Sequence, residues 1–234
     1  MRFLSNLPAI LFVFYVVLLS PFLAWRKSRK RTSGRPLTSK LRRTRFTVLY
    51  LFALTLFAVV AALASHIHIP LRVSIYDVIV IVGVGGCWGY FGARGIRRRS
   101  QAKMQRTRIL YAPTTPQELR WALLSGVCAG IGEEIIYRGV LFALLLRFTS
   151  SLIIAVLICV VAFGLSHLAQ GKKAAIVVGY IGLMFHVLFL LRHTLAVPIG
   201  IHMIYDLVIL STWYGVEKNL AVQAAKSQAV GQSA

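Results

Sequence analysis

The residues best suited to chemistry are Glu133, Glu134 and Arg138, which lie in a stretch that otherwise reads as membrane-buried helix, from Leu119 to Leu146. The chain has six acidic residues, and two of them are adjacent here. A charged side chain near the centre of a bilayer costs at least ~2.5–3.5 kcal/mol. Such groups persist where they are paired, face a polar cavity or take part in a reaction. This block is therefore the first candidate functional site.

Helical spacing predicts different roles for the two glutamates. Glu134 and Arg138 are four residues apart, in the order that favours an ion pair on a helix. Glu133 lies about 100° further round the helix, and its spacing matches that of Tyr137 instead. One carboxylate is then neutralised, while the other stays free to take a proton as a general base. A purely structural network of buried ion pairs is the alternative.

Two more groups of polar residues lie further along the chain. Phe163 and His167 end one apolar run, and His202 and Asp206 lie four residues apart inside a later one. A lone histidine at the end of a span is more typical of a membrane interface than of a catalytic site. A carboxylate that orients a histidine, by contrast, is common in catalytic and metal sites. We therefore expect His202 and Asp206 to share a polar site, and we interpret the isolated His186 as packing.

Other common sites are not indicated. The sequence contains no HExxH zinc motif, serine nucleophile elbow or glycine-rich phosphate loop. His66 and His68 lie in a short expected external loop, Ser65–Val73, without further ligands nearby, so they are interpreted as loop histidines. Asp77, near the start of an apolar run, is interpreted as an interfacial polar residue.

The composition defines the elements that must position these residues. Of the 234 residues, 58% are hydrophobic, and the mean hydropathy is +0.74, whereas soluble domains contain about 45–50% apolar residues. Long uncharged apolar runs recur along the chain. They predict an all-α, polytopic transmembrane helical bundle. We expect about seven spans, or eight if the fourth is split.

The expected spans follow from the apolar runs and their basic flanks, and they are Phe3–Trp25, Phe46–Ala64, Ser74–Ala93, Gln117–Arg147, Ser151–His167, Ala174–Leu191 and Leu195–Trp213. The fourth would be ~46 Å long as a helix, more than a bilayer core requires. We expect it to be tilted or to begin along the membrane surface. One crossing is favoured because a second would put Lys172 and Lys173 outside.

These spans divide the chain into three predicted parts. Residues 1–115 hold three N-terminal helices with two basic cytoplasmic loops, residues 116–214 form a catalytic four-helix membrane core, and residues 215–234 form a flexible cytoplasmic tail. The tail is expected to be loosely ordered because it is small and polar.

The charge distribution predicts the orientation. The net charge is +21, and of 27 Lys and Arg residues ten lie between Arg26 and Arg45 and seven between Arg94 and Arg108. Basic clusters between apolar spans follow the positive-inside rule, so the N-terminus is expected outside and the C-terminus inside. No base-reading module accompanies the charge, which argues against nucleic acid as a partner. Anionic lipid headgroups at the basic loops are the expected partners.

Three motifs in order resemble a known family. Glu-Glu-x-x-x-Arg from Glu133, Phe-x-x-x-His ending at His167 and His-x-x-x-Asp from His202 resemble the motifs of the CAAX protease and bacteriocin-processing family of intramembrane proteases. The resemblance covers about Glu118 to Val208. It implies a membrane-embedded endopeptidase within a helical bundle, acting in CAAX-type or bacteriocin- or immunity-type processing.

The resemblance also implies roles for six residues. Glu133 would activate the attacking water, with Glu134 and Arg138 supporting it. The side chains that would bind the water or stabilise the oxyanion are His167, His202 and Asp206. Two mechanisms stay open, a metal-free glutamate mechanism and a metalloendopeptidase with zinc held by Glu133, His167 and His202.

One residue departs from the family pattern. Prenyl-protein endopeptidases typically have Asn where this chain has Asp206, and an ionised carboxylate can only accept hydrogen bonds. The difference favours a metal, a protonated Asp206 or an orienting role toward His202. It also argues against a prenylated substrate, so a peptide or a membrane-anchored protein is the broader expectation. The sequence leaves the oligomeric state open.

The expected location follows from the topology. His167 falls at the cytoplasmic end of its span, so the active site is expected toward the cytoplasm or laterally toward lipid, in a bacterial inner (plasma) membrane. Two other classes remain as alternatives. Buried Glu, His and Asp also form proton relays in proton-coupled transporters, although the inverted repeats common in carriers are not evident. The other is a non-catalytic scaffold.

Overall fold

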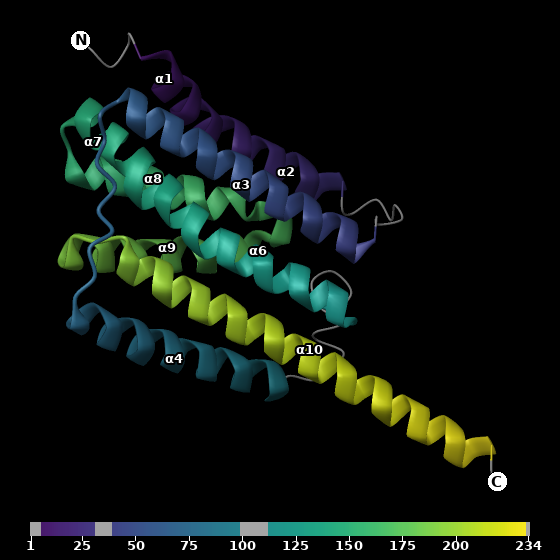
Figure 1. The fold of residues 1–234 in the computed structure, drawn as a ribbon. Helices are drawn as coiled ribbons and strands as arrows, with labels where there is room; N and C mark the ends of the chain where they lie inside the picture. The colour runs from purple at the N-terminus through teal and green to yellow at the C-terminus, as the bar shows by residue number, and fades with distance from the viewer. Residues whose placement is uncertain (1–5, 31–38, 99–111, 233–234) are drawn as a thin grey trace.

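The protein is a bundle of long helices. The computed structural model describes residues 6–30, 39–98 and 112–232, and these segments contain helices and no strand (Figure 1). The elements are α1 (Leu7–Phe14), η1 (Tyr15–Leu19), α2 (Ser20–Lys30), α3 (Lys40–Ala64), α4 (Ile75–Arg98), α6 (Pro116–Glu134), η3 (Ile135–Leu141), α7 (Phe142–Thr149), α8 (Leu152–Ser166), η4 (Leu168–Gln170), α9 (Lys172–Arg192) and α10 (Ala196–Gln232). The predicted all-α bundle is confirmed.

Six helices in the described segments are long and apolar enough to cross a membrane. The α1–η1–α2 rod, α3, α4, the α8–η4 rod, α9 and α10 supply them. The first predicted span began at Phe3, which lies outside the described residues, and its helix begins at Leu7. The chain is thus an integral membrane protein. The one expected span outside these six is the fourth, the helix that carries the two glutamates.

That helix is continuous from Pro116 to Thr149. α6, η3 and α7 follow one another directly, and the residues at their junctions have right-handed helical backbone angles, so the segment is not split. Its start is capped, because Thr115 accepts a hydrogen bond from the Glu118 amide while Glu118 accepts two from Thr114. α6 packs against both α3 and α10, which shields its charges from lipid.

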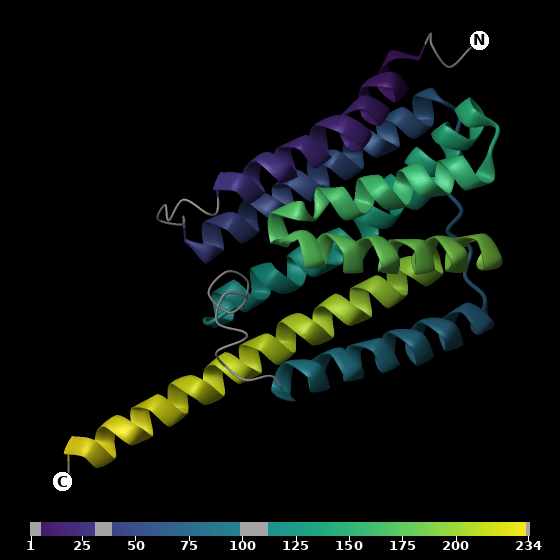
Figure 2. The ribbon, with the colours of Figure 1, turned by 180° about the vertical axis from the view of Figure 1, so that it is seen from behind.

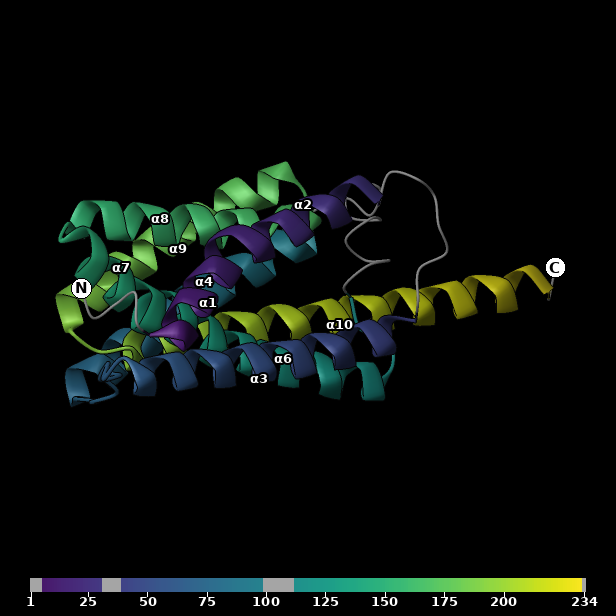
Figure 3. The same cartoon turned by 90° about the horizontal axis from the view of Figure 1, so that it is seen from above.

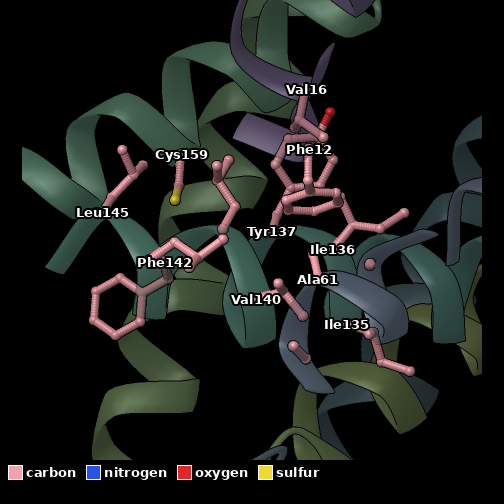
Figure 4. Packing of buried hydrophobic residues seen from close by; sticks show 14 of the residues in the cluster. Phe12, Val16, Ala61, Ile135, Ile136, Tyr137, Val140, Phe142, Leu145 and Cys159 are labelled. Atoms are coloured by element: carbon pink, nitrogen blue, oxygen red, sulfur yellow. The ribbon is translucent and has the colours of Figure 1, made fainter. Parts of the chain in front are cut away.

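The seven-residue segment η3 is a π-helix that begins directly after Glu134. π segments are rare and occur frequently at functional sites. Every residue of η3 is buried, and its apolar side chains pack with Phe12 of α1, Ala61 of α3 and Cys159 of α8 (Figure 4). The candidate site is therefore built on the most tightly enclosed part of the bundle.

The basic ends of several helices lie at the same end of the bundle. The end of α2, the start of α3, the end of α4 and the start of α6 lie at the same end of the bundle (Figures 1 and 2). α2 reaches Lys30, α3 starts at Lys40 and α4 reaches Arg98, so the helices extend into both basic segments. The remainder of the expected loops, residues 31–38 and 99–111, lies outside the described residues. Asn6 lies at the opposite end, where its Nδ2 donates to the Ala64 carbonyl at 2.6 Å.

Glycines allow α10 to approach its neighbours closely. A Cβ atom at Gly89 of α4 would lie 3.2 Å from Val208, and one at Gly126 of α6 would lie 3.1 Å from Cβ of Asp206. Small residues at helix crossings are a general means of packing in membranes, where the hydrophobic effect does not drive helices together. The glycines of α4 and α6 thus bring the His202–Asp206 segment of α10 against the glutamate helix.

The C-terminal tail differs from the expectation. α10 continues as a helix to Gln232 and projects beyond the other helices (Figure 3), whereas a loosely ordered chain was predicted after residue 214. The segment beyond Glu217 is rich in Ala, Gln and Lys and contains no proline. These residues have high intrinsic helix propensity, which favours continuation of the helix.

Candidate functional site

The deepest part of the site is an ion pair on the central helix. Nη1 of Arg138 lies 3.2 Å from Oε1 of Glu134, and both side chains are 0% exposed. The pair has the i, i+4 spacing that the sequence predicted. Breaking a buried pair by removing one partner is costly because the other charge is left uncompensated. This pair is therefore a fixed element of the site.

α10 brings a histidine to the same carboxylate oxygen. Nδ1 of His202 lies 3.0 Å from Oε1 of Glu134, and Nε2 of His202 lies 3.7 Å from Oδ2 of Asp206. The first distance is a hydrogen bond, and the second is an ion-pair distance too long for one. His202 is thus held between a buried and a partly exposed carboxylate, as expected for a shared polar site.

Glu133 faces a histidine on a different helix. Its Oε1 lies 4.0 Å from Nε2 of His167, and each side chain is 16% exposed. Nδ1 of His167 lies 2.9 Å from the Phe163 carbonyl, and a carbonyl can only accept a hydrogen bond. Nδ1 must therefore carry the hydrogen, so that in the neutral ring Nε2 presents its lone pair toward Glu133.

The six predicted site residues come together in two layers. Asp206 interacts electrostatically with Glu133 and His167 as well as with His202, which joins the outer groups of α6, α8 and α10. Glu134 and Arg138 form the inner, fully buried layer. The separate motifs of the sequence therefore form one cluster. The chemical roles of its members stay predictions.

Arg138 is enclosed by Phe163 of the second motif and by two residues that the motifs do not include. Its Nη2 donates to the Gly182 carbonyl of α9 at 2.8 Å, and its guanidinium carbon lies 4.6 Å from the Phe163 ring centre and 5.7 Å from that of Phe185. Sequence reasoning missed Gly182 and Phe185. No local signal could have found them, because α9 reads as an ordinary apolar span.

Other polar residues lie apart from this cluster or beside it. His186 is buried, with Nδ1 at 3.3 Å from the Gly182 carbonyl and its ring against Phe142. Asp77 lies near the start of α4, where it accepts from the Ser74 amide and from Nε of Arg192. Asp77 thus ties α4 to α9 away from the cluster.

The donor set does not fit a zinc ion in this arrangement. In the described part of the chain, no three His, Cys, Asp or Glu side chains are grouped closely enough to hold a metal. The expected ligand His202 already has Nδ1 on Glu134 and Nε2 near Asp206. Zinc sites in enzymes use three converging protein ligands. No step of the reaction below therefore passes through a metal.

The fold and the cluster define an all-helical integral membrane protein with a buried acid–histidine site. Residues 115–208 match the family model for Rce1-like, type II CAAX prenyl endopeptidases. This part of the chain is thus similar to Rce1-like endopeptidases, and the resemblance found over Glu118 to Val208 is confirmed. No curated protein and no solved structure matches the chain. The match supports a membrane protease of the CAAX-endopeptidase type.

Proposed function

We propose that the protein is an intramembrane endopeptidase in which Glu133 activates the attacking water. The observation that carries the proposal is the gap of 4.0 Å between Oε1 of Glu133 and Nε2 of His167. This separation is too long for a direct hydrogen bond, but one water can bridge it with two bonds of ordinary length. Such a water would donate to both atoms and keep a lone pair directed at a substrate carbonyl.

The reaction follows from these positions. The water oxygen attacks the carbonyl carbon of the scissile peptide, its proton passes to Glu133, and the carbonyl π electrons move to the oxygen. The tetrahedral intermediate then collapses and the C–N bond breaks. Protonated Glu133 gives its proton to the departing nitrogen, which leaves as an amine while a carboxylic acid is formed. General acid–base catalysis of this kind typically contributes about 10²–10⁴-fold.

The inner layer would help to stabilise the negative charge that develops on the carbonyl oxygen of the substrate. A doubly protonated His202 donates from Nδ1 to Glu134, which lies 3.0 Å away. Its Nε2 hydrogen is then available to the oxyanion or to Asp206, at 3.7 Å. Fixed donors aimed at the developing charge are worth most where water is excluded. In this scheme Asp206 orients His202, and the catalysis is independent of metal.

The proposed location is a bacterial plasma membrane with the site toward the cytoplasm. The basic helix ends lie at one end of the bundle, and His167 ends α8 beside the α8–α9 turn. That turn lies short of the end reached by α2, α3 and α6 in two views (Figures 2 and 3). We infer that the substrate, a peptide or membrane-anchored protein, enters there, where anionic headgroups contact the basic ends.

The decisive experiment compares two glutamates of the same helix. Purified protein in liposomes is given fluorogenic peptides with a CAAX-type C-terminus, prenylated and unprenylated, and an unmodified apolar peptide pool. Glu133→Gln should abolish cleavage, while Glu118→Gln, which keeps an oxygen acceptor for Thr114, should retain it. Undiminished cleavage by Glu133→Gln would remove that residue as the base, and no cleavage by the native protein of any peptide would count against the function itself.

A further inference from the structure

α9 contributes no motif residue, yet it forms one wall of the site. The Gly182 carbonyl accepts from Nη2 of Arg138 at 2.8 Å, and the Phe185 ring lies 5.7 Å from the same guanidinium. Arg138 in turn holds Glu134, which holds His202. A chain of direct contacts therefore leads from α9 to the residues of the proposed reaction.

Gly182 leaves room for the guanidinium. A Cβ atom at this position would lie 2.8 Å from Cδ1 of Phe163 and 3.2 Å from Nη2 of Arg138. Phe163 cannot move freely, because its ring packs edge-on against Tyr137 and its backbone carbonyl accepts from His167. A side chain at position 182 would thus displace Arg138 and also Phe163, whose carbonyl is hydrogen-bonded to His167.

Phe185 provides the second aromatic ring near the guanidinium. Its ring centre is 5.6 Å from that of His202 and 5.8 Å from that of Trp88, on which it stacks. The Arg138 guanidinium consequently lies over two aromatic rings, those of Phe163 and Phe185. Cation–π contacts of this kind gain strength where the cation is removed from water, and Arg138 is fully buried.

We propose that Gly182 and Phe185 are positioning residues that set the place of Arg138 and, through Glu134, the orientation of His202. They touch neither the proposed water nor the substrate carbonyl. Their effect is on the geometry of the inner layer, where small displacements of catalytic groups cost about 10²-fold in rate. The activity measurement for this inference rests on the proposed function. The stability measurement does not, because it depends only on the ion pair between Glu134 and Arg138.

The activity test uses matched residues of α9. Phe185→Leu and Gly182→Ala should each lower kcat by about 10- to 100-fold with little change in KM. Their controls are Phe189→Leu, one turn away and packed on Phe142, and Gly179→Ala, where a Cβ would meet Gly164 at an ordinary 3.7 Å. Both controls should keep the native kcat.

The stability test does not require catalysis. Phe185→Leu is made in the native protein and in the double variant Arg138→Met/Glu134→Gln, in which neither charge is left unpaired. The fall in melting temperature should be clearly smaller in the second background, because the guanidinium is already gone, whereas Phe189→Leu should cost the same in both. Residues in contact show such non-additivity, and independent ones do not.

The outcomes separate the two proposals. Equal melting losses for Phe185→Leu in both backgrounds would overturn the positioning role, as would a kcat for Phe185→Leu equal to that of Phe189→Leu. If Gly182→Ala does not fold, the Phe185 comparison decides. If the native protein cleaves no peptide, the proposed function fails, and the melting comparison alone decides whether α9 holds Arg138.

Discussion

Nδ1 of His202 lies 3.0 Å from Oε1 of Glu134, the oxygen that Nη1 of Arg138 also contacts, at 3.2 Å. A single carboxylate oxygen thus joins α6, η3 and α10 in the interior of the bundle. Glu133, one residue earlier, has a partly exposed side chain and faces His167 across 4.0 Å. The two adjacent glutamates therefore differ in burial and in the contacts that they make.

The contrast between the glutamates predicts opposite effects of the same substitution. Glu134→Gln leaves Arg138 buried beside a neutral group, and breaking a buried pair costs about 3–5 kcal/mol. Glu133 is partly exposed, and its Oε1 lies 4.0 Å from Nε2 of His167, so Glu133→Gln should keep the native stability while losing activity. Chemical denaturation in detergent measures both. Equal stability of the two variants would contradict the two-layer description.

Arg138→Lys tests the shape of the cation as opposed to its charge. Lysine can approach Glu134 but cannot present a planar fork that also reaches the Gly182 carbonyl and contacts two aromatic rings. Loss of a hydrogen bond from a charged donor costs about 1.5–3 kcal/mol. We expect Arg138→Lys to be less stable by about this amount and to cleave peptides more slowly. Native stability and rate in Arg138→Lys would show that charge alone suffices.

Much of the site could be predicted from the sequence because its pairs are local. Glu134 with Arg138, and His202 with Asp206, have i, i+4 spacing, which fixes their common helix face before any tertiary contact forms. The spacing of residues within one helix does not show that these groups meet across helices. That meeting was suggested only by the order of the three motifs along the chain.

The rest depends on contacts that a single sequence does not display. The π segment η3 arises where a buried core surrounds it, and the role of Gly182 depends on the approach of Arg138 from another helix. Tyr137, matched by spacing with Glu133, instead packs edge-on against the Phe163 ring at 4.9 Å. The helical tail beyond residue 214 was missed because polarity was weighed above helix propensity.

The Asp77 cluster predicts a stability effect without a catalytic one. Asp77 accepts from the amide and hydroxyl of Ser74 and from Arg192, which caps α4 and ties it to α9. Asp77→Ala should therefore lower the melting temperature by a few degrees and leave kcat and KM unchanged. A selective loss of kcat in this variant would mean that the α4–α9 tie acts on the site.

Removal of metal should not affect the proposed reaction. His202 is held by Glu134 and lies near Asp206, and the scheme assigns every proton to a side chain. Activity should survive exhaustive chelation. Metal analysis of the active protein should find far less than one zinc per chain, and the zinc content of the His202→Ala variant should be the same. Loss of activity on chelation, restored by zinc, would contradict this prediction and would require His202 to leave Glu134.

This chain has Asp206 at the position where the prenyl-endopeptidase pattern has Asn. If Asp206 orients His202, its oxygen matters more than its charge, because Nε2 of His202 lies 3.7 Å from Oδ2 and needs an acceptor on that side. Asp206→Asn keeps an oxygen acceptor and should retain most activity, and its amide could also donate to an oxyanion. Asp206→Ala removes the partner, and loss of an orienting group typically costs about 10- to 100-fold. Steady-state kinetics of both variants on the same peptide measure the difference. Equal losses in the two would mean that the negative charge itself is required, and equal retention would mean that His202 is held by Glu134 alone.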